Sequence, residues 1–289
     1  MTRVYRPGQL ILDAASRFAS GHAPAGASWP EPARWEGAVI GWLDTINRSR
    51  VGSTLLQHLG ARSGALASST ELRIVPMPAE AEPGYAQTDL QLADASTVPA
   101  RPRTVYVAIT PLDALGRTPS LEPMRHPAPV LVHELLHGLM NLHGVNSLID
   151  DSGARRPIAA WRDDAGAYPI FNEFLGTTLQ NMYLAELGLV LADGYHADDP
   201  EIQNWRLVHE DLPARPIGHF AARASVDEGR FATRYAEPLR YLRQALPQFV
   251  AALAALPGLP FNPFRALAAP SSPRGSGQPG RPVRLPTRI

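Results

Sequence analysis

The sequence predicts an α+β fold that is mostly helical, with a small sheet in its N-terminal half. Two short runs rich in apolar and β-branched residues, 72–77 and 104–110, predict strands. Longer segments carry apolar residues at helical spacing and predict amphipathic helices, most clearly at 34–46, 130–143 and 170–187. Because the strands fall early and helices dominate afterwards, we expect sheet and helices to be segregated rather than alternating.

Prolines and glycines mark the expected helix ends. Pro127 stands just before the helix at 130–143, where a proline suits a first turn. Gly144 follows that helix, and Gly188 follows the helix at 170–187, both at positions that suit a helix stop. Two further helices are expected at 53–59 and 239–256.

The chain of 289 residues divides into three expected parts. Residues 1–32 are expected to form a flexible segment, a secretion signal or a linker, and they lack the apolar block of a classical signal peptide. Residues 33–265 are expected to form the folded domain. Residues 266–289, rich in Pro, Gly and Arg, are expected to be a disordered tail.

Composition excludes several functions. The net charge of zero argues against a dedicated nucleic-acid binder, and no apolar run is long enough to span a membrane. With no cysteine, the protein has no disulfide, thiolate metal site or cysteine nucleophile, so a metal ion would need His, Asp or Glu ligands. All 27 basic residues are arginine; GC-rich codon usage and avoidance of ubiquitin acceptors both remain open as reasons.

The motif His133-Glu134-Leu-Leu-His137 is the strongest functional signal. The spacing i, i+4 places both imidazoles on one helix face, about 40° apart around the axis. Two imidazoles one turn apart can hold one zinc ion, and the glutamate beside them is placed to act as general base on a water. The motif predicts a zinc hydrolase with Glu134 as the catalytic residue.

A catalytic zinc needs a third protein ligand, and the sequence offers two candidates. Glu173 lies 36 residues after His137, in the first turn of the next long helix and among apolar neighbours. His143 lies ten residues after His133, but on an unbroken helix it would be about 15 Å along the axis from it. Glu173 is therefore the preferred ligand, and the metzincin-like use of His143 is the alternative.

These segments resemble a known family. The stretch His133–Gly144 looks like the zinc helix of clostridial neurotoxin light chains, which are gluzincins. The closer resemblance is to the NleD-like zinc metallopeptidase effectors, which bacteria deliver into host cells by type III secretion. It rests on Trp42–Leu56, on the zinc helix and on Asn172–Phe174.

The resemblance implies a zincin-like, monomeric zinc endopeptidase with one Zn²⁺ ion held by His133, His137 and Glu173. It further implies a virulence role in the host cytosol, on a host signalling protein such as a kinase. The neurotoxins use a distal Arg–Tyr pair to stabilise the transition state. Residues of the right type here are Arg234, Tyr235, Arg240 and Tyr241, although structural pairing on a helix is the favoured interpretation of each.

A third interpretation lies outside enzymology. The HELLH sequence could be accidental, in a non-catalytic helical interaction module. The zinc content of the purified protein separates this reading from both peptidase readings.

Overall fold

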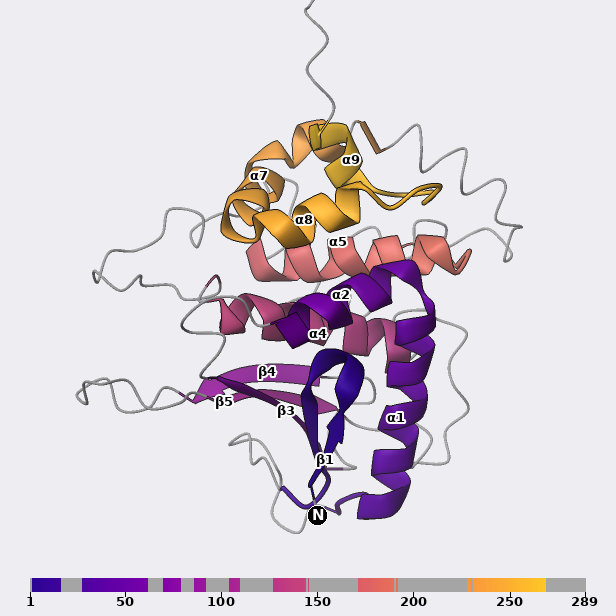
Figure 1. The fold of residues 1–289 in the computed structure, drawn as a ribbon, viewed down its shortest axis with the longest axis vertical. Coiled ribbons are helices and arrows are strands. Elements are labelled where there is room, and N and C mark those ends of the chain that lie inside the picture. The colour runs from indigo at the N-terminus through magenta and orange to yellow at the C-terminus, as the bar shows by residue number, and fades with distance from the viewer. Residues whose placement is uncertain are drawn as a thin grey trace, which may run out of the picture.

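The computed structural model describes residues 2–16, 28–61, 70–78, 86–91, 104–109, 127–143, 145, 171–189, 191, 228–229 and 231–268. They stack in layers (Figure 1). A sheet forms one end; α2 (Arg50–Ala61) and α4 (Pro127–Leu142) lie over it, and α5 (Phe171–Glu186) lies above them. The C-terminal helices cover α5 at the other end of the molecule, so the predicted α+β class is confirmed.

The sheet has five strands in the order β1-β2-β3-β5-β4. Their bounds are β1 Thr2–Tyr5, β2 Leu10–Asp13, β3 Glu71–Pro76, β4 Ala86–Gln91 and β5 Thr104–Ile109. The inner strands β2, β3 and β5 run parallel, while the edge strands β1 and β4 are antiparallel to their neighbours. The two predicted strands are confirmed as β3 and β5, which pair directly.

The expectation that residues 1–32 form a flexible segment is wrong for residues 2–13. They fold back through a 3-10 turn, η1 (Arg6–Gly8), into an antiparallel pair that occupies one edge of the sheet. Leu10 and Leu12 of β2 are fully buried in the core, which is why this segment is ordered. Residues 17–27 lie outside the described residues.

Helix α1 (Pro32–Arg48) runs along the side of the sheet (Figure 1). Its first turn is capped by Glu31, whose carboxylate accepts hydrogen bonds from the backbone N–H groups of Ala33 and Arg34 at 3.0 and 2.7 Å. Trp35 packs its buried ring inward and donates a hydrogen bond from Nε1 to the carbonyl of Ile109, at the end of β5. This bond ties the start of α1 to the end of the inner strand β5.

The junction between α1 and α2 is a tight corner. Ser49 Oγ donates to the Ile46 carbonyl at 2.8 Å and accepts from the Gly52 N–H at 2.9 Å, so it caps both helices. The carboxylate of Glu186, at the end of α5, accepts from the N–H groups of Arg50 and Val51 at 2.8 and 2.9 Å. The first turn of α2 is therefore held by the last turn of α5.

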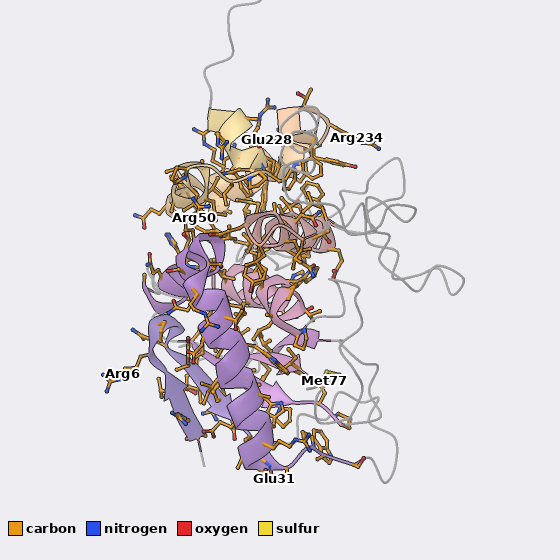
Figure 2. The ribbon with its side chains drawn as sticks, turned by 90° about the vertical axis from the view of Figure 1, so that its right-hand side faces the viewer. Arg6, Glu31, Arg50, Met77, Glu228 and Arg234 are labelled. Carbon is orange, nitrogen blue, oxygen red and sulfur yellow. The ribbon has the colours of Figure 1, made fainter. Side chains whose placement is uncertain are left out.

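The C-terminal helices are α7 (Ala236–Ala245), α8 (Pro247–Ala254) and α9 (Pro263–Ala268). The single helix predicted at 239–256 is wrong, because Pro247 cannot continue the hydrogen-bonding of α7 and starts α8 instead. Residues 266–268 belong to α9 rather than to the predicted tail, whose remaining residues lie outside the described ones. Figure 2 shows Glu31 and Met77 near the sheet end, and Glu228 and Arg234 at this helical end.

No helix in the described part of the chain is both long enough and apolar enough to cross a membrane.

Candidate metal centre

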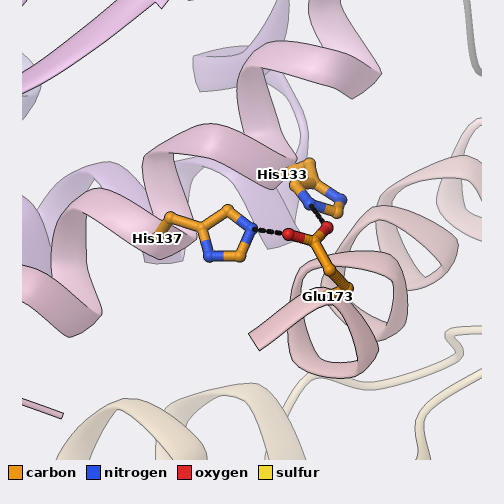
Figure 3. Close-up of side chains that lie close together, drawn as sticks. All are labelled: His133, His137 and Glu173. Atoms are coloured by element: carbon orange, nitrogen blue, oxygen red, sulfur yellow. Dashed lines mark hydrogen bonds and ion pairs between the residues drawn. The ribbon is translucent and has the colours of Figure 1, made fainter. Parts of the chain in front are cut away.

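Helix α4 carries the two histidines of the HExxH motif. Fifteen of its sixteen residues are buried, because the helix packs between the sheet, α1, α2 and α5. His133 and His137 lie one turn apart on the side that faces α5, with ring centroids 4.7 Å apart (Figure 3). Both side chains are buried, and burial among helices limits the orientations that their rings can adopt.

Helix α5 brings Glu173 to both imidazoles. One carboxylate oxygen, Oε2, lies 3.1 Å from His133 Nε2, and Oε1 lies 3.9 Å from His137 Nε2 (Figure 3). One ligand atom from each of the three residues falls within 4.8 Å of the others. Two imidazoles and a carboxylate at this separation can converge on one metal ion, so the predicted trio is brought together.

Burial and charge act against each other within the trio. Burial disfavours the protonated form of His133, but the hydrogen bond and negative charge of Glu173, with the charge of Glu134, outweigh it and raise its pKa. Burial lowers the pKa of His137 to about 4, and the charge of His133 adds to that effect against the attraction of Glu173. His137 is therefore a neutral imidazole near neutral pH, as a metal ligand must be.

Glu173 is a largely buried carboxylate, with 21% of its side chain exposed. Burial alone would raise its pKa, but the hydrogen bond from His133 and the electrostatic influence of the two imidazoles lower it. The group is thus an anion that depends on a cationic partner, and a divalent cation is a partner of the required sign. The chemistry of this donor set fits zinc, which accepts imidazole nitrogen and carboxylate oxygen together.

Two residues of α5 complete the surroundings of His133, and sequence reasoning missed both. Gln180 Oε1 lies 3.3 Å from His133 Nδ1. Gly176 lies against the ring: a Cβ atom at this position would stand 2.5 Å from His133 Nε2 and Cε1. With Glu173 they follow the spacing i, i+3, i+7, which marks one helix face and could have revealed them.

Glu134, the predicted general base, is buried beside the trio on α4. Its negative charge contributes to raising the pKa of His133, which places the two side chains within electrostatic reach of each other. Within the described part of the chain it is not one of the grouped residues His133, His137 and Glu173, and its role as general base stays a prediction.

His143 lies elsewhere. It closes the last turn of α4 by donating its N–H to the Leu139 carbonyl, and its side chain lines a cavity of about 250 Å³ together with His58. Burial, and then the charge of His58, lower its pKa. Among the described residues it is not part of the His133, His137 and Glu173 group.

The four candidate transition-state residues lie on or just before α7. The rings of Tyr235 and Tyr241 pack on Phe174 and Phe171, with centroids 4.8 and 5.2 Å apart, and these phenylalanines flank Glu173. The guanidinium of Arg234 lies 5.2 Å from the centre of the Tyr235 ring, and Arg240 is exposed. These contacts stabilise the turn that carries Glu173, and the catalytic role of the four residues stays a prediction.

Comparison of this chain with protein-family models, with curated proteins and with solved structures gave no match. The function of this chain is therefore inferred from the arrangement of His133, His137 and Glu173.

Proposed function

We propose that this protein is a zinc-dependent endopeptidase of the gluzincin type. The observation that carries the proposal is the convergence of His133, His137 and Glu173 within 4.8 Å, with Glu134 beside them on the same helix. The zincin-like identity of the fold is part of the proposal. It is supported by a ligand-bearing helix that packs on the sheet and a third ligand contributed by the following helix.

His133, His137 and Glu173 hold one Zn²⁺ ion in this proposal. Bound zinc supplies a Lewis acid that polarises the scissile carbonyl and acidifies a water molecule. The carboxylate of Glu134 takes the proton of the attacking water and passes it to the departing amine. His133 and His137 are buried and Glu173 is 21% exposed, which limits competition from bulk water at the ligand atoms.

The substrate and setting are proposed from the family resemblance alone. A polypeptide of a host cell, such as a signalling kinase, is the proposed substrate, and the host cytosol, reached by type III secretion, is the proposed place of action. The protein is proposed to act there as a monomeric bacterial effector or toxin.

The proposal is tested by metal analysis and by cleavage in parallel. The purified wild type and Glu134→Gln should each contain about one zinc per chain, since Glu134 is not a ligand. Glu173→Ala should lose zinc, and His143→Ala should keep it. In a eukaryotic cytosolic lysate with labelled N-termini, new termini should appear with the wild type and not with Glu134→Gln, which should lose several powers of ten in activity.

Each rival has its own outcome. Wild-type protein without bound metal would support the interaction module with an accidental motif. Loss of zinc in His143→Ala, but not in Glu173→Ala, would support the metzincin-like site. Wild-type protein that binds zinc but produces no new N-termini would support the metal site and contradict the proposed peptidase activity.

A further inference from the structure

The imidazole of His133 is contacted on both of its nitrogens by one helix. Nε2 faces Glu173 Oε2 at 3.1 Å, and Nδ1 faces Gln180 Oε1 at 3.3 Å. Glu173 and Gln180 are seven residues apart, two turns along α5. Gly176 lies between them, where a Cβ would stand 2.5 Å from the ring, so the ring rests directly on the helix backbone.

The contact to Gln180 decides which nitrogen of His133 can bind a metal. A neutral imidazole carries one proton, and only the other nitrogen has a free lone pair. The oxygen Oε1 of Gln180 can only accept a hydrogen bond, so it favours the proton on Nδ1. With the Nδ1 proton held in this way, Nε2, which hydrogen-bonds Glu173 in the structure, is the nitrogen that gives up its proton and offers a lone pair when a metal ion binds.

Gln180 is buried at a cost to stability, which indicates that its contact with His133 has a function. Its side chain is fully buried, and its Nε2 has no hydrogen-bond partner in the described structure. A buried amide with an unsatisfied N–H group is costly, so stability alone does not explain a glutamine here. The contact that its amide does make is the one to the histidine.

We propose that Gln180 is a positioning residue of the metal centre. Its side-chain carbonyl accepts the Nδ1–H of His133, fixes that tautomer and holds Nε2 toward the ion. The inference rests on the proposed function only in requiring that the trio binds a metal, and it is independent of peptidase activity.

The test compares two substitutions of similar size in the full chain. Gln180→Met removes the acceptor together with the unsatisfied amide, and we expect zinc affinity to fall about 10- to 100-fold, as for loss of an outer-shell partner. Gln180→Glu keeps an acceptor for Nδ1–H, and we expect it to bind zinc within a few-fold of the wild type. Affinity is measured by competition with a chromophoric zinc chelator.

A spectroscopic readout separates positioning from a merely structural role. In zinc-loaded wild type and in Gln180→Glu, long-range ¹H–¹⁵N spectra should show His133 protonated at Nδ1. In zinc-loaded Gln180→Met the Nδ1–H has lost its acceptor, so its ¹H signal should shift and should exchange faster with solvent, even if the melting temperature of the variant without metal is unchanged or higher. The wild-type spectrum needs no variant, so the test survives a variant that fails to fold.

Three results would overturn the inference. Equal zinc affinity of Gln180→Met and wild type would show that Gln180 does not position His133, although the chain still binds the metal. Protonation of His133 at Nε2 in the zinc-loaded wild type would do the same. Wild type that takes up no zinc at all would reject the metal site itself.

Discussion

Replacing Gly176 with alanine should weaken the metal centre by forcing two helices apart. A Cβ at this position would lie 2.5 Å from His133 Nε2 and Cε1 and 2.9 Å from Cδ2. Carbon atoms in ordinary contact are about 3.5–4.0 Å apart, so ring and backbone must separate by about 1 Å. The ring has little freedom to turn away, because Glu173 and Gln180 contact its two nitrogens.

The separation should affect metal binding more than stability. Overpacking lowers the free energy of unfolding by about 1–3 kcal/mol, and the better helix propensity of alanine offsets about 1 kcal/mol of this loss. We therefore expect the free energy of unfolding to fall by roughly 0–2 kcal/mol in total. Glu173, one turn earlier on α5, moves with the backbone, and zinc ligands must lie within about 0.2 Å of their preferred distances. A loss of tenfold or more in zinc affinity should follow.

The assay is a zinc titration of Gly176→Ala beside Gly41→Ala. Gly41 is an exposed glycine in α1 with no atom within 4 Å of an added Cβ, so its replacement should stabilise the protein and leave zinc binding unchanged. If Gly176→Ala instead behaves like Gly41→Ala, with tighter folding and unchanged zinc affinity, the close approach of α5 to His133 is not what the site requires.

Two further predictions concern stability. Glu186→Ala should lower the free energy of unfolding by about 2 kcal/mol, and Glu186→Gln by less. The reason is that the carboxylate accepts hydrogen bonds from the N–H groups of Arg50 and Val51 and from the Arg50 side chain. Urea denaturation measures this change, and unchanged midpoints for both variants would contradict the prediction. Burial lowers the pKa of both His58 and His143, so the unfolded chain binds protons first, and stability should fall as the pH drops below about 6.5. His143→Gln should flatten that fall; parallel curves for variant and wild type between pH 7 and 5 would refute the reasoning.

Sequence reasoning located the three residues that the structure brings together, because each is marked by a local feature of the sequence. The i, i+4 pair of histidines defines a helix face whatever the helix packs against. Glu173 stood out as a charged residue among apolar neighbours in a first helical turn. Gln180 did not stand out, because its role depends on how closely α5 approaches α4, and that distance is a property of the packed helices.

The errors in the fold prediction have physical causes as well. The edge strand β1 exposes three of its four residues, so it lacks the alternating pattern that identifies a half-buried strand. The other edge strand, β4, has the polar sequence Ala-Gln-Thr-Asp-Leu-Gln. Pro247 was a visible signal for the break between α7 and α8, but the apolar periodicity on both sides of it concealed the break.

Helix α5 contacts neighbouring helices at both of its ends, and these contacts determine how far the helix can tilt. Its first turn carries Glu173 toward α4, and its last residue, Glu186, holds the start of α2. A helix of sixteen residues is about 24 Å long, so a shift of 0.2 Å at one end corresponds to a tilt of only about half a degree. The contacts of Glu186 with α2 therefore limit the tilt of α5. They help to hold Glu173 in place, although they lie at the opposite end of the helix from the candidate metal site.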